Sequence, residues 1–129
     1  MDDFLKKFLL NSEAKSLATF GKYGINVIPV STIFIEEDKI ILVDYFMQKT
    51  LENILENKEI SFAAWRDLFG FQIKADCEYV KDGELFKKIV VKVKDILPDR
   101  IVKGILILSI KNIVDIAPSK NTREHFSNL

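Results

Sequence analysis

The fold is decided by the stretch Ile40-Ile41-Leu42-Val43-Asp44-Tyr45-Phe46-Met47-Gln48-Lys49-Thr50-Leu51-Glu52-Asn53-Ile54-Leu55-Glu56-Asn57. Its first four residues form an apolar run rich in β-branched side chains, which is typical of a buried strand. The period then becomes helical, because Leu51, Ile54 and Leu55 share one face and polar residues occupy the other. The stretch therefore predicts a strand that leads into a short amphipathic helix over residues 49–57.

Short apolar segments on both sides of this stretch predict further strands. The glycine-bracketed turn Gly21-Lys22-Tyr23-Gly24 is typical of a hairpin and joins the first two of them. Pro29 has no N–H to give to a neighbouring strand, so it marks an edge position or a bulge. With the strand already described, six strands are expected, over residues 16–20, 25–35, 40–43, 60–65, 71–80 and 105–116.

Two further helices and a polar tail complete the predicted order. Apolar spacing predicts a helix within residues 1–12 and another over residues 85–97, which Pro98 stops. Residues 118–129 form the polar tail. Consecutive short strands with few helices between them disfavour a doubly wound parallel sheet. We therefore expect one domain, residues 1–129, mainly β with flanking helices and built on a six-stranded antiparallel barrel, since closure removes exposed strand edges.

The composition of the 129 residues excludes several classes of protein. With 48% hydrophobic and 29% charged residues, the chain is globular rather than disordered. Its 19 Lys and Arg residues balance 19 Asp and Glu residues, so neither nucleic acid nor a membrane surface is expected as a partner. The longest apolar runs, such as residues 104–110, fall far short of the ~20 residues that span a bilayer, and no signal peptide is visible. We therefore expect a cytoplasmic protein, and its single cysteine, Cys77, excludes an intrachain disulfide and a thiolate zinc site made by one chain.

The junction between the central strand and its helix is a candidate phosphate site. Free N–H groups and the dipole at a helix N-terminus attract an anion, and Lys49 adds a positive charge. Thr50 offers a hydroxyl to a phosphate oxygen, and Asn53 lies one turn further along the same side. The alternative is that Thr50 caps the helix with Asn53 as an imperfect capping-box partner, and these residues alone favour the cap.

Ser31 and Thr32 are a second candidate, because consecutive hydroxyls beside Pro29 can bind a polar ligand, although threonine is also common in ordinary strands. Cys77 is expected to pack as a small hydrophobic residue, and His125 to be exposed in the tail. No acid–base pair and no known catalytic motif is visible, so we predict neither catalytic residues nor metal ligands. If the protein is an enzyme, a bound cofactor must carry the chemistry.

Four segments, in this order, resemble the pyridoxamine 5′-phosphate oxidase-related FMN-binding split barrels, above all their small single-domain flavoproteins. The segments are Ser16-Leu17-Ala18-Thr19-Phe20, Asn26-Val27-Ile28-Pro29-Val30-Ser31, Met47-Gln48-Lys49-Thr50-Leu51-Glu52-Asn53-Ile54-Leu55-Glu56-Asn57 and Gly70-Phe71-Gln72-Ile73-Lys74-Ala75. The resemblance covers residues 13–117, and its most specific part is the segment over residues 49–57 followed by a strand.

The resemblance implies a split β-barrel that forms a homodimer and holds FMN at the subunit interface. It reverses the preference for a simple cap, because Lys49 and Thr50 would hold the FMN phosphate with the help of Asn53. The implied cofactor-binding residues are Val30, Ser31 and Thr32 along the ribityl chain and ring, Asp44, Tyr45 and Phe46 beside the isoalloxazine, Lys49, Thr50 and Asn53 at the phosphate, and Gln72 from the following hairpin.

These implications make the chain an FMN-binding flavoprotein that acts as an oxidoreductase or an electron carrier. One alternative is a non-catalytic flavin-binding, storage or dimeric scaffold protein. Another is pyridoxamine 5′-phosphate oxidase activity, which is disfavoured because the basic C-terminal substrate region of that oxidase is missing. Some relatives bind a deazaflavin or haem in place of FMN. In the tail, Phe126 and Leu129 are expected to dock, on the partner subunit near the flavin.

Overall fold

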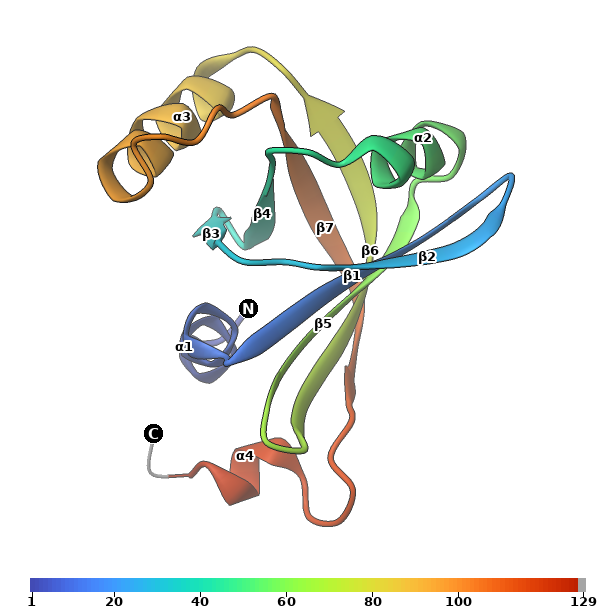
Figure 1. Ribbon diagram of the computed structural model, residues 1–129. Coiled ribbons are helices and arrows are strands. Elements are labelled where there is room, and N and C mark those ends of the chain that lie inside the picture. The colour runs from blue at the N-terminus through green and yellow to red at the C-terminus, as the bar shows by residue number, and fades with distance from the viewer. Residues whose placement is uncertain (128–129) are drawn as a thin grey trace.

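The computed structural model describes residues 1–127, which form an antiparallel sheet surrounded by four helices (Figure 1). The helices are α1 (Asp3–Asn11), α2 (Gln48–Glu56), α3 (Glu84–Ile96) and α4 (Thr122–His125). The strands are β1 (Ala14–Gly21), β2 (Gly24–Pro29), β3 (Ile33–Glu36), β4 (Lys39–Asp44), β5 (Glu59–Arg66), β6 (Phe69–Val80) and β7 (Gly104–Asp115). Within the described residues, no helix has the length and hydropathy needed to cross a bilayer.

All neighbouring strands are antiparallel, in the order β2-β1-β5-β6-β7-β4-β3. The sheet has seven strands, not the six predicted, because the single strand expected over residues 25–35 is two strands. Pro29 ends β2, where it has no N–H to donate, and the chain leaves the sheet before β3 begins at Ile33. The fold class is nevertheless the predicted one, a mainly β split barrel with flanking helices.

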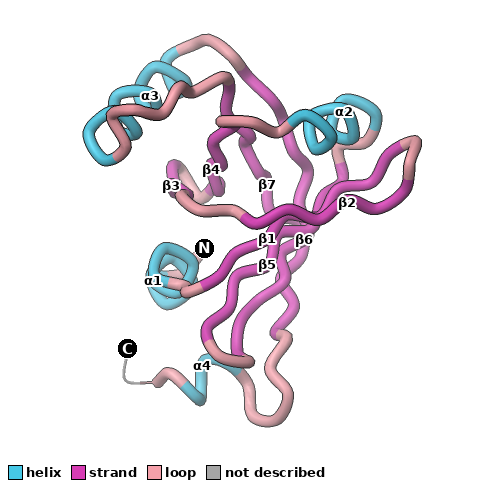
Figure 2. The backbone as a smooth tube through the Cα atoms, viewed as in Figure 1, coloured by secondary structure: helices cyan, strands magenta, loops and turns pink. Residues whose placement is uncertain are grey.

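The two edge strands of the sheet, β2 and β3, are also consecutive in the chain (Figure 2). Residues 30–32 connect them, and a link of that length spans at most about 14 Å. Since paired strands lie about 4.8 Å apart, the sheet must curl until its edges face each other across a narrow gap. The two edges of the barrel are therefore joined by the connection between β2 and β3 and not by hydrogen bonds between these strands.

The inward-facing side chains of the curled sheet form the main core together with α1. Phe62 of β5, Ile73 of β6 and Leu106 of β7 are almost completely buried there. Leu5 and Leu9 lie on one face of α1 and pack into the same core. Burying a side chain of this size contributes roughly 1.5–3 kcal/mol, so this packing is the main stabilising term of the fold.

The strand β4 is covered on both faces, which explains its continuous apolar sequence. Ile40 and Leu42 face the barrel interior, whereas Ile41 and Val43 belong to a second core formed with α3. Ile89, on the apolar face of α3, is completely buried in that second core. The end of β4 is thereby held between two packed layers.

The C-terminal tail contains the short helix α4, which lies beneath the barrel in Figure 1. Thr122 is buried, and its hydroxyl donates to the Asp115 carboxylate at 2.8 Å. The Phe126 ring packs on Phe8 of α1, with 5.8 Å between ring centroids. Phe126 therefore docks on its own chain, because α4 folds back on the barrel from which it came. Leu129 lies outside the described residues.

Candidate functional site

A pocket of about 290 Å³ opens where β4 ends and the link between β2 and β3 passes. Its lining residues are Ile28, Pro29, Val30, Ser31, Thr32, Val43, Tyr45, Phe46 and Met47. Five of the predicted cofactor-binding residues are in this lining, namely Val30, Ser31, Thr32, Tyr45 and Phe46. The curl of the sheet thus brings together two segments that the sequence analysis treated as separate candidates.

Asp44 shapes this pocket without lining it. Its side chain is buried, and its two carboxylate oxygens accept hydrogen bonds from the Met47 N–H at 2.8 Å and from the Tyr79 hydroxyl at 2.6 Å. Its main-chain carbonyl accepts from the Lys103 N–H at 2.9 Å. Burial and the Asp44 carboxylate raise the pKa of the Tyr79 hydroxyl, so the phenol keeps the proton that it donates. Asp44 therefore holds the turn between β4 and α2 in place.

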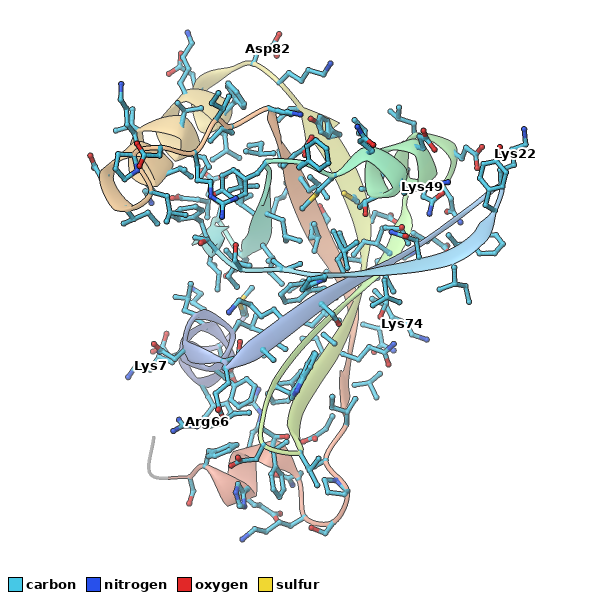
Figure 3. All side chains as sticks on the ribbon, in the orientation of Figure 1. Lys7, Lys22, Lys49, Arg66, Lys74 and Asp82 are labelled. Atoms are coloured by element: carbon cyan, nitrogen blue, oxygen red, sulfur yellow. The ribbon has the colours of Figure 1, made fainter. Side chains whose placement is uncertain are left out.

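The helix α2 begins beside the pocket, and no side chain of residues 1–127 caps it. Met47 is the N-cap residue and makes no side-chain hydrogen bond to the helix, so the alternative in which Thr50 is the cap is wrong. Met47 also lines the pocket, so the uncapped helix end begins next to the pocket wall. Lys49 is exposed there, and its Nζ lies 4.8 Å from the centroid of the Tyr23 ring. Figure 3 shows Lys49 at the side of α2 near the tip of the β1–β2 hairpin.

Thr50 and Asn53 face inward and fasten α2 to that hairpin. Thr50 is 1% exposed, and its hydroxyl accepts a hydrogen bond from Asn26 Nδ2 at 3.1 Å. Asn53 is 8% exposed and donates to the Thr19 hydroxyl at 3.1 Å. Among the three residues expected at the phosphate, Lys49 is the one whose side chain is open to a ligand.

Gln72 lies away from the pocket, on the outer face of the sheet. Its Nε2 donates to the Ser61 hydroxyl at 2.8 Å. The strand register places Pro29, Ser16, Ala63 and Gln72 in one row across β2, β1, β5 and β6. Three strand spacings of about 4.8 Å therefore separate Gln72 from the pocket edge of the same chain.

A larger hollow, of about 570 Å³, lies on this outer face. Its lining residues are Ala18, Thr19, Phe20, Ile25, Glu59, Ile60, Ser61, Lys74, Ala75, Lys111 and Asn112. None of the predicted cofactor-binding residues is in this lining. Figure 3 shows Lys74 on the opposite side of the β1–β2 ribbon from Lys49. Phe20, Ile25 and Val27 expose 53%, 77% and 62% of their surface on the same face, and an apolar surface of this kind marks an interaction site.

Two residues that the sequence analysis set aside behave as predicted. Cys77 packs in the core at 4% exposure, and burial together with the charge of Glu78 raises the pKa of its thiol to about 12. His125 is exposed, although its ring stacks on Phe69 with 3.7 Å between centroids. Over residues 1–127, no group of three or more His, Cys, Asp or Glu side chains is arranged to hold a metal ion.

The sequence of this chain matches a known protein family. Residues 1–111, from α1 into β7, match the family model described as pyridoxamine 5′-phosphate oxidase. The chain belongs to this family. It is also 34% identical over 113 residues to an uncharacterized protein of Methanocaldococcus jannaschii, a match that covers 83% of this chain and 75% of that protein. The pyridoxamine 5′-phosphate oxidase match includes the pocket and the whole of α2.

Solved structures share the fold of this family member at low sequence identity. HupZ of Group A Streptococcus is 18% identical, with a TM-score of 0.82 over 94% of this chain and 98% of that one. An FMN-binding protein of Syntrophomonas wolfei is 19% identical, with a TM-score of 0.76 over 93% of this chain and 91% of that one. At such identities the likeness shows the fold alone, and it confirms the predicted split barrel.

The sequence analysis missed several residues around the site. The sequence did contain a signal for Tyr79, because this residue places a hydroxyl at the end of the otherwise apolar face of β6. No such signal distinguishes Asn26, which donates a hydrogen bond to Thr50, from any other polar residue of a strand. Arg100 and Lys103 reach the site from the connection between α3 and β7, and no local pattern predicts that approach.

Proposed function

We propose that this member of the pyridoxamine 5′-phosphate oxidase family binds FMN and acts as an oxidoreductase or an electron carrier. The observation that carries the proposal is that Met47 both lines the pocket and is the N-cap residue of α2, whose first turn has no side-chain cap from it. Tyr45 and Phe46 offer aromatic surface to a flavin ring. The free helix N–H groups and Lys49 offer positive charge to a phosphate. The protein of the same fold from Syntrophomonas wolfei is described as FMN-binding.

The chemistry of the pocket fits a flavin. The hydroxyl of Tyr45 is buried and lacks a hydrogen-bond partner among residues 1–127, and such a group needs one. An isoalloxazine edge carries several nitrogen and oxygen atoms that can supply it, and ribityl hydroxyls match those of Ser31 and Thr32. When bound, FMN would supply hydride or single-electron transfer, while these residues bind and orient it.

The size of the pocket favours a second subunit. Its volume of about 290 Å³ lies at the lower limit of the roughly 300–1,000 Å³ of ligand pockets, so one protomer would leave part of the cofactor uncovered. The proposal therefore includes a homodimer that packs through the outer face of the sheet. On that face, small residues such as Ala18 and Ala63 lie near the exposed Val27. Gln72 lies on the same face and would reach the flavin of the partner subunit.

The phosphate placement is tested by comparing FMN with riboflavin, which lacks the phosphate. Lys49→Ala should weaken FMN binding at least about tenfold and leave riboflavin binding unchanged, because a charge-assisted hydrogen bond is lost. Fluorescence titration measures both affinities, and a bound flavin shows an absorption band at about 450 nm. Lys87→Ala, on the exposed side of α3, is the control. Equal losses of affinity for FMN and riboflavin would contradict the phosphate site. If the protein binds neither ligand, the proposal that it binds a flavin is wrong.

The dimer is tested with two valines of equal exposure. Val27 on the outer face and Val91 on α3 are each 62% exposed. Val27→Asp should yield monomers in sedimentation velocity, because it buries an unpaired charge in the interface, whereas Val91→Asp should not. A monomeric wild type, or a Val27→Asp variant that stays dimeric, would contradict the interface.

An enzyme and a carrier differ in turnover. Steady oxidation of a reduced nicotinamide nucleotide or another donor by the FMN-loaded protein would show an oxidoreductase. Slow single-turnover exchange with every donor would show a carrier. Formation of hydrogen peroxide from pyridoxamine 5′-phosphate would show the oxidase activity itself.

A further inference from the structure

The turn between β6 and α3 contains the sequence Lys81-Asp82-Gly83-Glu84, which holds the only Asp-Gly pair of the chain. All four residues are exposed. Figure 3 shows Asp82 at the top of the molecule, on a different side from Lys74, which borders the hollow on the outer face of the sheet. The pair would therefore stay accessible to water in the proposed homodimer as well as in the single subunit.

The two groups of this pair that can react with each other make no hydrogen bond within residues 1–127. The Asp82 carboxylate accepts none and joins no ion pair, and the Gly83 N–H donates none. Gly83 is the N-cap residue of α3 and contributes to the helix through its carbonyl, which accepts from the Lys87 N–H at 3.1 Å. Groups that are exposed and unbonded can react in the folded protein, because no local opening has to precede the reaction.

Gly83 adds little steric hindrance around its own nitrogen. Its φ of 95° lies in the left-handed region that favours glycine, and a Cβ atom at this position would meet nothing within 4 Å. Asp67, in the turn between β5 and β6, gives the comparison, because it is also exposed but is followed by Leu68. The branched side chain of Leu68 shields the nitrogen that follows Asp67. The turn at Asp82 therefore combines exposure, free reacting groups and an unhindered nitrogen.

We propose that Asp82–Gly83 is a site of spontaneous isomerisation, at which aspartate becomes isoaspartate. The Gly83 nitrogen attacks Cγ of the neutral Asp82 side chain and forms a bond to it. The carboxyl hydroxyl leaves together with the amide proton as one water molecule, which gives a five-membered succinimide ring. Water then opens this ring at either carbonyl. Opening at Cγ restores aspartate, whereas opening at the main-chain carbonyl leaves the chain running through Cγ, with no oxidant or reductant involved.

The product carries one extra methylene group in the main chain directly before α3. Because the insertion precedes the N-cap residue, it displaces the first turn of the helix, in which the Gly83 carbonyl accepts from Lys87. Ile89 lies further along α3 and is completely buried in the second core. The isomerisation should therefore loosen the first turn of α3 and leave the rest of the helix packed on the barrel.

Ageing of the native protein at neutral pH in water enriched in heavy oxygen tests this proposal. Ring opening should place one heavy oxygen atom in the peptide that contains Asp82, and mass spectrometry should detect isoaspartate there. The peptide that contains Asp67 is the internal control and should gain neither. The folded protein should react at least about one-third as fast as a synthetic peptide of residues 78–87, because the reacting groups are unprotected. Asp82→Glu keeps the charge but would have to form a less favourable six-membered ring, so it should abolish the signal.

Two further measurements follow the product. Aged protein should accept a methyl group from an isoaspartate-specific methyltransferase, whereas fresh protein and aged Asp82→Glu should not. In the isomerised protein the Lys87 amide should exchange at least about twofold faster, with exchange at Ile89 unchanged. Absence of isoaspartate at Asp82, a folded protein that reacts more slowly than the limit above, or equal heavy-oxygen uptake at Asp67 would overturn the proposal. Unchanged exchange at Lys87 would contradict the effect on α3.

Discussion

The Tyr79 hydroxyl donates a 2.6 Å hydrogen bond to the buried carboxylate of Asp44, across 35 residues of sequence. The other oxygen of that carboxylate accepts from the Met47 N–H at 2.8 Å. One side chain thus connects β6 to the turn that carries the pocket walls Tyr45 and Phe46. The position of those walls depends on a pair of residues that do not line the pocket themselves.

Removal of the Tyr79 hydroxyl should therefore affect both stability and the site. Tyr79→Phe should lower the free energy of unfolding by about 1–3 kcal/mol, because it leaves a buried carboxylate oxygen without its partner. Urea denaturation measures this loss, and flavin affinity should fall with it. Tyr23→Phe is the control, since Tyr23 is 76% exposed. A variant as stable as wild type would show that the hydrogen bond contributes nothing to the turn.

Gly104 makes room for the Tyr79 ring. A Cβ atom at Gly104 would collide with the ring and hydroxyl of Tyr79, so no larger residue fits at the start of β7. Gly104→Ala should lower the free energy of unfolding by about 1–3 kcal/mol through overpacking. The same change should cost much less in a Tyr79→Leu background, where the ring is absent. Equal losses in both backgrounds would place the cause elsewhere in β7.

The docked tail should respond to acid through Asp115. Its carboxylate accepts from the N–H groups of Thr122 at 2.7 Å and Ala117 at 2.9 Å. Partial burial raises the pKa of Asp115, but these hydrogen bonds and the charge of Arg123 outweigh it and hold the pKa below its ordinary 3.8. Because the folded pKa is the lower one, the stabilisation is complete above about pH 3.8 and is lost as the pH falls through the folded value.

The amide chemical shift of Thr122 reports this titration directly. Its midpoint should lie below 3.8, and the shift should not titrate in Asp115→Asn. In that variant α4 should exchange its amide protons faster at neutral pH. A midpoint at or above 3.8 would contradict the role given to the Thr122 and Ala117 bonds.

Cys77 should be chemically inert in the folded protein. Its thiol is buried and its pKa is raised to about 12, so almost no thiolate forms near pH 8. An aromatic disulfide reagent should react slowly with the native protein and completely after unfolding in guanidinium. Rapid reaction in the native state would show that β6 opens locally.

The sequence predicted the local elements well because each depends on nearby residues. The alternation that ends at Tyr79 and the apolar spacing of Leu51 and Ile54 are properties of a few neighbouring positions. There were two exceptions, the helix α4 in the predicted polar tail and the break after Pro29. The proline was recognised as an irregularity, but the curl of the sheet decides that the chain crosses from one edge to the other there.

The candidate site was only partly predictable, because its parts meet through the tertiary fold. Ser31 and Tyr45 were chosen separately and share one pocket, and the position of Lys49 at the helix end follows from the local pattern. The burial of Thr50 depends on Asn26, a contact between segments far apart in the chain. Arg100 approaches from a connection 55 residues beyond Tyr45, a distance over which periodicity carries no information.

Within the described part of the chain, the facing edges of β2 and β3 retain main-chain N–H and C=O groups that no neighbouring strand satisfies. Every amino acid except proline carries the same two groups, so point mutation rarely removes them. A ligand that binds to main-chain groups places few constraints on which side chains the protein carries there. The barrel fold can therefore persist while most of the sequence changes, as solved structures of the same fold with only 18% or 19% sequence identity illustrate.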